Sequence, residues 1–208
     1  SIAVGARIGA AHGFFFARLG VPSFVVTLAG LIGWRGAGRI LVDGEDAATR
    51  TTASLATVFG YVFQSPSQML FARTVREELL FGPRNLGLPL DDPDGVAMAA
   101  LRRTGLAGEE GILDRPPMTL SFGQQKRLAL AIALSLEPAT LILDEPSAGL
   151  APAFVEAIFE KVEEINRAGV TIVMVEQNVK ATLPAVEHAV ILKAGKLLIG
   201  QTANILLF

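Results

Sequence analysis

The sequence of 208 residues contains no cysteine, which excludes disulfide bonds and thiolate metal sites. Its net charge of −2 lacks the basic excess that nucleic-acid-binding domains usually carry, so we expect no nucleic-acid partner. Lysine is absent from the first half of the chain, and the first one is Lys126. No phosphate-binding loop of the form G-x-x-x-x-G-K-[ST] occurs anywhere in the chain.

Residues 1–38 also lack any acidic residue. Within them, residues 19–34 form a run of sixteen uncharged residues that contains Pro22, shorter than the 18 or more expected of a membrane-spanning helix. No small-residue cleavage site ends this run cleanly, so we do not expect a signal peptide. Two interpretations stay open: a buried strand–helix pair at the start of an α/β domain, or a segment in or on a membrane.

Residues 39–208 alternate strand-like and helix-like patterns, which predicts an α/β fold with a mixed sheet. A tight hairpin is expected to turn at Asp43-Gly44. Continuous apolar runs predict fully buried parallel strands. These runs lie in residues 140–144 and 170–175. Further strand-like segments lie in residues 39–46 and 60–64, and residues 189–200 are expected to close the domain as a hairpin.

Four segments have helical signals. The first begins at Thr74, with Glu77 at capping-box spacing, and is expected to end at Gly82-Pro83. The second and third cover residues 93–105 and 124–136, and the fourth runs from Pro152 to a stop at Gly169. The predicted buried face of the fourth comprises Phe154, Val155, Ile158, Phe159, Val162 and Ile165. Residues 70–118 are expected to form a helical insertion.

The buried run "TLILDEP" ends on two adjacent carboxylates, Asp144 and Glu145. Ligands of open α/β sheets bind at the carboxyl ends of strands, so these charges arrive where a site is expected. Successive side chains on an extended backbone point apart. Asp144 could therefore hold Mg²⁺ while Glu145 faces an attacking water.

Ser121 and Gly123 lie in "LSFGQQKRLALAIAL", where we expect them to precede a long helix. A glycine lets backbone N–H groups approach an anion closely, and the N-terminus of the helix adds its positive dipole end. In isolation, this segment is better explained as an ordinary serine N-cap. The long helix that connects it to Asp144 and Glu145 favours the anion site.

Together these motifs resemble the ATPase subunit of ABC transporters. "LSFGQ" (120–124) is similar to the signature motif, "TLILDE" (140–145) to the Walker B strand with the catalytic glutamate, and "SAGLA" (147–151) to the D-loop. Gln64 falls at the Q-loop and Gln177 at the position of the switch histidine. The resemblance implies the ABC-type, P-loop NTPase-like fold with a helical subdomain at about 70–118 and a truncated or atypical N-terminus at 1–38.

Three segments resemble different ABC-transporter proteins. Residues 55–135 are similar to the ATPases of energy-coupling-factor importers, and residues 140–200 to those of branched-chain amino-acid importers. Residues 19–38 resemble a transmembrane stretch of monosaccharide permeases. Whether the chain is natural, chimeric or designed stays open.

The resemblance implies that two ATPase subunits enclose two ATP molecules head to tail, with Mg²⁺, beneath transmembrane subunits on the cytoplasmic face of the membrane. The family's phosphate loop would fall at residues 14–24, which offer no lysine and no Ser/Thr pair. At the chain's own nucleotide, the implied catalytic residues are Glu145 and Gln177, the implied nucleotide contact is Gln64, and the implied Mg²⁺ ligands are Asp144 and Gln64. The residues implied to contact the partner's ATP are Ser121, Gly123 and Gln124.

The expected function is the energy-coupling ATP-binding subunit of an ABC-type importer, impaired at its own ATP site because the phosphate loop is missing. One alternative is a degenerate partner that only donates its signature motif. Another is a catalytically dead, chimeric or designed α/β protein. Autonomous ATP hydrolysis that depends on Glu145 would favour the enzyme, and hydrolysis that needs an intact partner would favour the donor.

Overall fold

A computed structural model describes residues 41–42, 45–178, 182, 188–193, 196–201 and 205–207. The chain forms two compact units, Ser1–Thr51 and Thr52–Phe208. The predictions for residues 1–38 lie outside the described residues. Within the described part of the chain, none of the helices combines the length and apolarity needed to cross a membrane.

The first unit contains the predicted hairpin. Strand β1 (Leu41–Val42) pairs antiparallel with β2 (Glu45–Asp46). The 3₁₀ helix η1 (Ala47–Thr49) follows, and the Asp46 carboxylate caps it by accepting the N–H of Ala48 at 3.0 Å. The pairing confirms the hairpin, whose turn at Asp43-Gly44 lies outside the described residues.

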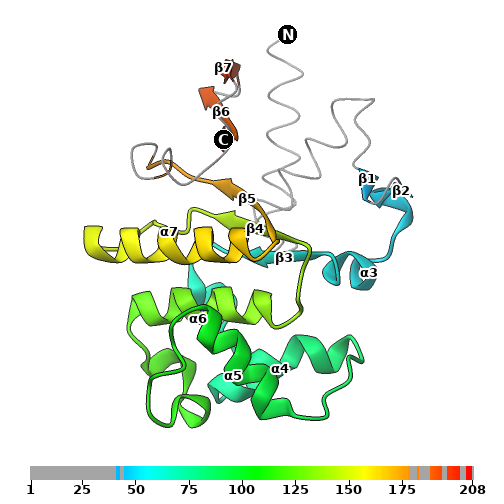
Figure 1. Ribbon diagram of the computed structural model, residues 1–208, viewed down its shortest axis with the longest axis vertical. Coiled ribbons are helices and arrows are strands. Elements are labelled where there is room, and N and C mark those ends of the chain that lie inside the picture. The colour runs from blue at the N-terminus through cyan, green and yellow to red at the C-terminus, as the bar shows by residue number, and fades with distance from the viewer. Residues whose placement is uncertain are drawn as a thin grey trace, which may run out of the picture. The chain divides into compact units, whose positions relative to one another are not determined.

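The second unit begins with helix α3 (Thr52–Ala56) and is built on a parallel sheet in the order β3-β4-β5 (Figure 1). Its strands are β3 (Phe59–Val62), β4 (Thr140–Asp144) and β5 (Thr171–Val175). All three carboxyl ends therefore meet at one edge. A second sheet comprises β6 (His188–Lys193), β7 (Lys196–Gln201) and β8 (Ile205–Leu207), with β6 antiparallel to β7 as the closing hairpin predicted.

The four predicted helices are present. They are α4 (Val75–Asn85), α5 (Pro93–Arg103), α6 (Phe122–Leu134) and α7 (Pro152–Arg167), with 3₁₀ helices η2 (Pro66–Gln68), η3 (Ile112–Asp114) and η4 (Pro117–Thr119) between them. Helices α6 and α7 share one apolar cluster with the sheet, and the other side of α6 joins a second cluster with α4 and α5. Helix α6 thus lies between the sheet and the α4–α5 pair (Figure 1).

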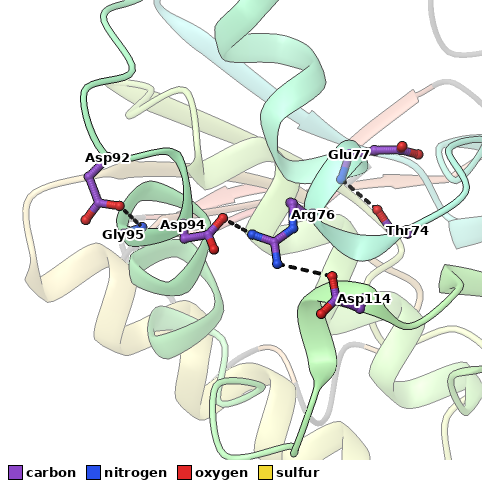
Figure 2. Close-up of polar contacts among 7 residues, drawn as sticks. All are labelled: Thr74, Arg76, Glu77, Asp92, Asp94, Gly95 and Asp114. Carbon is purple, nitrogen blue, oxygen red and sulfur yellow. Dashed lines mark hydrogen bonds and ion pairs between the residues drawn. The ribbon is translucent and has the colours of Figure 1, made fainter.

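Polar contacts join the elements of residues 70–118. Figure 2 shows Arg76 of α4 between Asp94 of α5 and Asp114 of η3. The Arg76 guanidinium donates a hydrogen bond to each carboxylate, to that of Asp114 at 3.1 Å. The Thr74 hydroxyl accepts the N–H of Glu77 at 3.2 Å, as a capping box predicts. The Glu77 carboxylate, however, accepts from the N–H of residue 73 at 3.0 Å rather than from that of Thr74. Only half of the predicted box is therefore formed.

The prediction that Gly82-Pro83 ends the first helix is wrong, because α4 continues to Asn85. The proline Cδ clashes with the N–H and the Cβ of a helical preceding residue, and Gly82 has no Cβ, which removes part of that clash. Just beyond the end of α4 at Asn85, the N–H of Leu88 donates a hydrogen bond to the Pro83 carbonyl at 3.0 Å.

The predicted buried face of α7 is correct except at Phe154. Val155, Ile158, Phe159, Val162 and Ile165 are buried, whereas the Phe154 side chain is 57% exposed. Phe154 lies in the first turn of α7, beside the start of α6: a Cβ built on Gly123 would lie 3.8 Å from its ring. It therefore adds an exposed aromatic ring to the surface at the α6 N-terminus.

Candidate functional site

The carboxyl edge of the parallel sheet gathers three of the predicted site residues. Gln64 follows β3, Glu145 follows β4 and Gln177 lies just after β5. The side-chain amides of Gln64 and Gln177 each donate to one oxygen of the Glu145 carboxylate, both at 2.6 Å. Residues distant in sequence thus converge because their strands are parallel neighbours.

The sequence predicted an extended backbone at Glu145, and this prediction is wrong. Its φ is +43°, a left-handed conformation that costs a non-glycine residue of order 1–3 kcal/mol. Its N–H still donates to the Val175 carbonyl at 2.8 Å, so the residue pairs with β5 while the chain turns away. Asp144 and Glu145 are therefore separated by a turn at the strand end rather than by the pleat.

Asp144, the predicted Mg²⁺ ligand, accepts a hydrogen bond from the Tyr61 hydroxyl of β3 at 3.1 Å. Burial first, and then the negative charge of Asp144, raise the pKa of Tyr61. Tyr61 therefore stays a neutral donor that orients the carboxylate. The alternation of β3 puts Tyr61 on the sheet face opposite to Val62, a signal from which this contact could have been inferred.

Two buried charges near Glu145 were missed in the sequence. Lys126 of α6 donates from Nζ to the carbonyls of Glu145 and Pro146. Glu176, between β5 and Gln177, accepts backbone N–H groups from the loop after β4 and from the loop after β5. Helical spacing places Lys126 on the same face of α6 as the core residue Leu130. A charged residue on an apolar helix face was the signal from which its burial could have been predicted.

The predicted signature segment begins α6 with a complete capping box. The Ser121 hydroxyl accepts the N–H of Gln124 at 3.3 Å, and the Gln124 side-chain oxygen accepts the N–H of Ser121 at 2.9 Å. The Gln124 amide also donates to Glu109 at 3.0 Å. Gly123 lies within the first turn rather than before the helix, a small correction to the prediction.

The packing around Gly123 at the start of α6 leaves room for a side chain. A Cβ built on Gly123 would meet its nearest neighbours, Phe154 and Leu150, at 3.8 and 3.9 Å, which are ordinary van der Waals contacts. The packing of this chain therefore does not require glycine there. An external group that comes close to the backbone would require it.

The described residues fit Mg²⁺ and a nucleotide in part. Asp144 and Glu145 supply the hard oxygen atoms that Mg²⁺ prefers. No group of three or more His, Cys, Asp or Glu side chains in the described part of the chain could hold a metal ion. An Mg²⁺ ion here would need phosphate oxygens and water as further ligands. The contact of Gln64 with Mg²⁺ stays a prediction.

The sequence profile of the ABC transporter family matches residues 23–148. A putative ABC transporter ATP-binding protein of Methanosarcina acetivorans is 38% identical over 183 residues, which cover 86% of this chain and 29% of that protein. The energy-coupling factor transporter ATP-binding protein EcfA of Methanothermobacter thermautotrophicus is 35% identical over 164 residues, covering 78% of this chain and 52% of that one. The chain thus spans about a third to a half of the length of these curated relatives.

Solved structures show the same fold. CbiO1 of Clostridium perfringens, described as part of the ABC transporter complex CbiONQ, superposes with a TM-score of 0.72 and 34% identity, covering 80% of this chain and 66% of that one. The ATP-binding cassette MJ0796, described as a dimer bound to ADP and Pi, gives a TM-score of 0.66 and 25% identity, with coverage of 81% and 74%. The chain therefore belongs to the ABC transporter family and has the α/β fold of its ATPase subunits.

Proposed function

We propose that this chain is the energy-coupling ATP-binding subunit of an ABC-type importer and acts mainly through its signature helix on ATP held by a second ATPase subunit. The similarity to EcfA and to CbiO1 supports the importer role. The proposal includes transmembrane partner subunits and a peripheral position on the cytoplasmic face of the membrane. It also divides the chain into residues 1–38 and an ATPase-like domain at 39–208, with a helical subdomain at about 70–118.

The observation that carries this proposal is the geometry at Gly123. Helix α6 has a capped N-terminus at Ser121, and its second residue is a glycine that internal packing does not need. Fixed N–H groups and the positive end of the helix dipole favour an anion at such a point. These contributions need no lysine, so they can serve a phosphate that another subunit holds.

The chain's own nucleotide site is proposed to be impaired. A phosphate loop supplies consecutive backbone N–H groups, a lysine on the β and γ oxygens, and a hydroxyl on Mg²⁺. The sequence before Lys126 has no lysine, and the planar guanidinium of Arg18 is a poor substitute for a compact ammonium group. Asp144, Glu145 and Gln177 then have no firmly held phosphate to act on.

The test is ATP turnover by an equimolar mixture of this chain and an intact ABC ATPase. Gly123→Asp places a carboxylate against the incoming phosphate and should abolish the stimulation. Gly123→Ala is the matched control for added bulk without charge, and it should retain part of the stimulation. Because an acidic residue in the first turn favours a helix, Gly123→Asp should fold at least as well as the parent chain.

A second substitution at the signature helix extends this test. Ser121→Arg should also abolish stimulation, but it removes the N-cap and is expected to cost about 1 kcal/mol of stability. Glu145→Gln should matter little, because Glu145 faces the chain's own impaired site. If Glu145→Gln stops turnover while Gly123→Asp leaves it intact, the proposed division of labour is wrong.

The convergence of Gln64 and Gln177 on Glu145 favours a second candidate function, an autonomous ATPase. In that case the purified chain alone would hydrolyse ATP, and Glu145→Gln would remove the activity. Gln177 could hydrogen-bond a γ-phosphate but could not carry a proton as a histidine does. A chain that neither hydrolyses ATP alone nor stimulates a partner would instead be inert, as a chimeric or designed protein would be.

A further inference from the structure

We propose that Lys126 and Glu176 are a pair of positioning residues that fix the loops after β4 and β5, and so hold Gln177 against Glu145. Neither touches the position of a nucleotide directly; both act through the backbone. The functional meaning of this pair rests on the second candidate function, the autonomous ATPase, because Glu145 and Gln177 matter only at the chain's own nucleotide site. Its structural content can be tested without nucleotide.

Lys126 donates hydrogen bonds to backbone carbonyls of the loop after β4. It projects from α6 and is only 5% exposed. Its Nζ donates to the Glu145 carbonyl at 3.0 Å and to the Pro146 carbonyl at 2.9 Å. A buried ammonium group that bonds two successive carbonyls holds this turn against α6, whose first turn carries the signature residues.

Glu176 accepts a hydrogen bond from a backbone N–H group of the same loop. It is 3% exposed, and one carboxylate oxygen accepts the N–H of Ser147 at 2.7 Å. The other oxygen accepts the N–H groups of Gln177 and Asn178 at 3.1 and 3.2 Å. One side chain therefore joins the loop after β4 to the loop after β5.

The two charges depend on each other. Burial lowers the pKa of Lys126, and among the charges that oppose this effect Glu176 is the largest. A buried ion that loses its compensating charge is costly, whereas removal of both together is much less so. Lys126 and Glu176 bond the backbone rather than each other, and both contact the turn after β4, where the left-handed Glu145 lies.

An ordinary stabilising role would lower stability without changing the contact between Gln177 and Glu145, so the readout must be that contact. We suggest NMR of the side-chain amide groups of Gln64 and Gln177 in the full chain without nucleotide. In the parent chain, one proton of each amide should show the downfield shift and slow exchange of a hydrogen bond to a carboxylate. Glu176→Gln should remove these features from Gln177 and leave those of Gln64 in place.

The double substitution Lys126→Met with Glu176→Gln separates charge balance from positioning. It should recover part of the stability that either single substitution loses, as measured by the urea midpoint, yet it should not restore the Gln177 signal. Glu160→Gln on the exposed surface of α7 is the matched control and should change neither quantity. Retention of the Gln177 signal in folded Glu176→Gln protein would overturn the proposal.

A measurement on the parent chain applies even if these variants fail to fold. The Ser147 amide is expected to exchange with solvent at least about 100-fold more slowly than an unprotected amide. Exchange at the unprotected rate would mean that Glu176 does not hold the loop, and it would overturn the proposal. None of these outcomes bears on the partner mixture above, so failure of the positioning pair and failure of the proposed function are distinguishable.

Discussion

Glu78 offers a sharp test of how this fold manages a buried charge. It lies on α4 and is 1% exposed, and a single carboxylate oxygen accepts the backbone N–H groups of Phe71 and Ala72, the latter at 2.5 Å. Desolvation raises the pKa of Glu78 above its usual value near 4.5, and the two N–H groups lower it by less. Only one oxygen makes these bonds, so an uncharged amide could replace the carboxylate.

Glu78→Gln keeps the accepting oxygen and removes the desolvated charge, so at pH 7 we expect a free energy of unfolding equal to or above that of the parent chain. Glu78→Ala leaves two N–H groups without an acceptor. Each such group costs about 1–3 kcal/mol where it is buried, so a total loss of about 2–6 kcal/mol follows. Urea unfolding of the three proteins, followed by circular dichroism, measures both differences.

The pH dependence checks the sign. Because the folded state has the higher pKa, the contribution of Glu78 to stability is fully present below pH 4.5 and is lost as the pH rises through its folded pKa. The advantage of Glu78→Gln over the parent chain should therefore vanish in acid and appear toward neutral pH. If Glu78→Gln is as destabilising as Glu78→Ala at pH 7, the reasoning is refuted.

Four further substitutions test the packing and one set of surface ion pairs by urea unfolding. Leu128 of α6 lies in the apolar cluster with α4 and α5, and Leu128→Ala should lower the free energy of unfolding by about 2–5 kcal/mol. Phe154→Ala on the surface should change it by no more than about 0.5 kcal/mol. Equal effects of the two substitutions would contradict the assigned core. Gly82→Ala should destabilise by about 1 kcal/mol or more despite the higher helix propensity of alanine, because its Cβ would lie 3.0 Å from Leu136; a gain in stability would refute this. Arg76→Ala should cost at most about 1 kcal/mol, and the loss should shrink in salt, because its ion pairs are partly exposed.

Most of the fold of the described residues follows from short-range patterns in the sequence. The apolar runs 140–144 and 170–175 are adjacent parallel strands, as predicted, but they are not fully buried. Only Leu141 and Leu143 of β4 and Met174 of β5 are buried. The same patterns placed Glu145 at a strand end, and parallel pairing then brought Gln64 and Gln177 to it. The family membership was visible in the ordered motifs, and the match at residues 23–148 agrees with it.

The exceptions have local physical causes. The helix through Pro83 depends on the absence of a side chain on the preceding residue, which a general rule for proline overlooks. Lys126 and Glu176 were missed because their partners are backbone groups of a loop, and no sequence pattern records such bonds. The roles of Ser121, Gly123 and Asp144 at a nucleotide stay predictions.

The central claim is that this chain lacks a phosphate cradle of its own, and calorimetric titration of the purified chain with ATP and Mg²⁺ tests it most directly. Under the proposal, the phosphates lack a lysine and a cradle of backbone N–H groups, and with them several charge-assisted hydrogen bonds, each worth about 1.5–3 kcal/mol. We therefore predict a Kd weaker than about 1 mM, or about −4 kcal/mol. A micromolar Kd would contradict the account, because it would mean that other groups in the chain hold the phosphates.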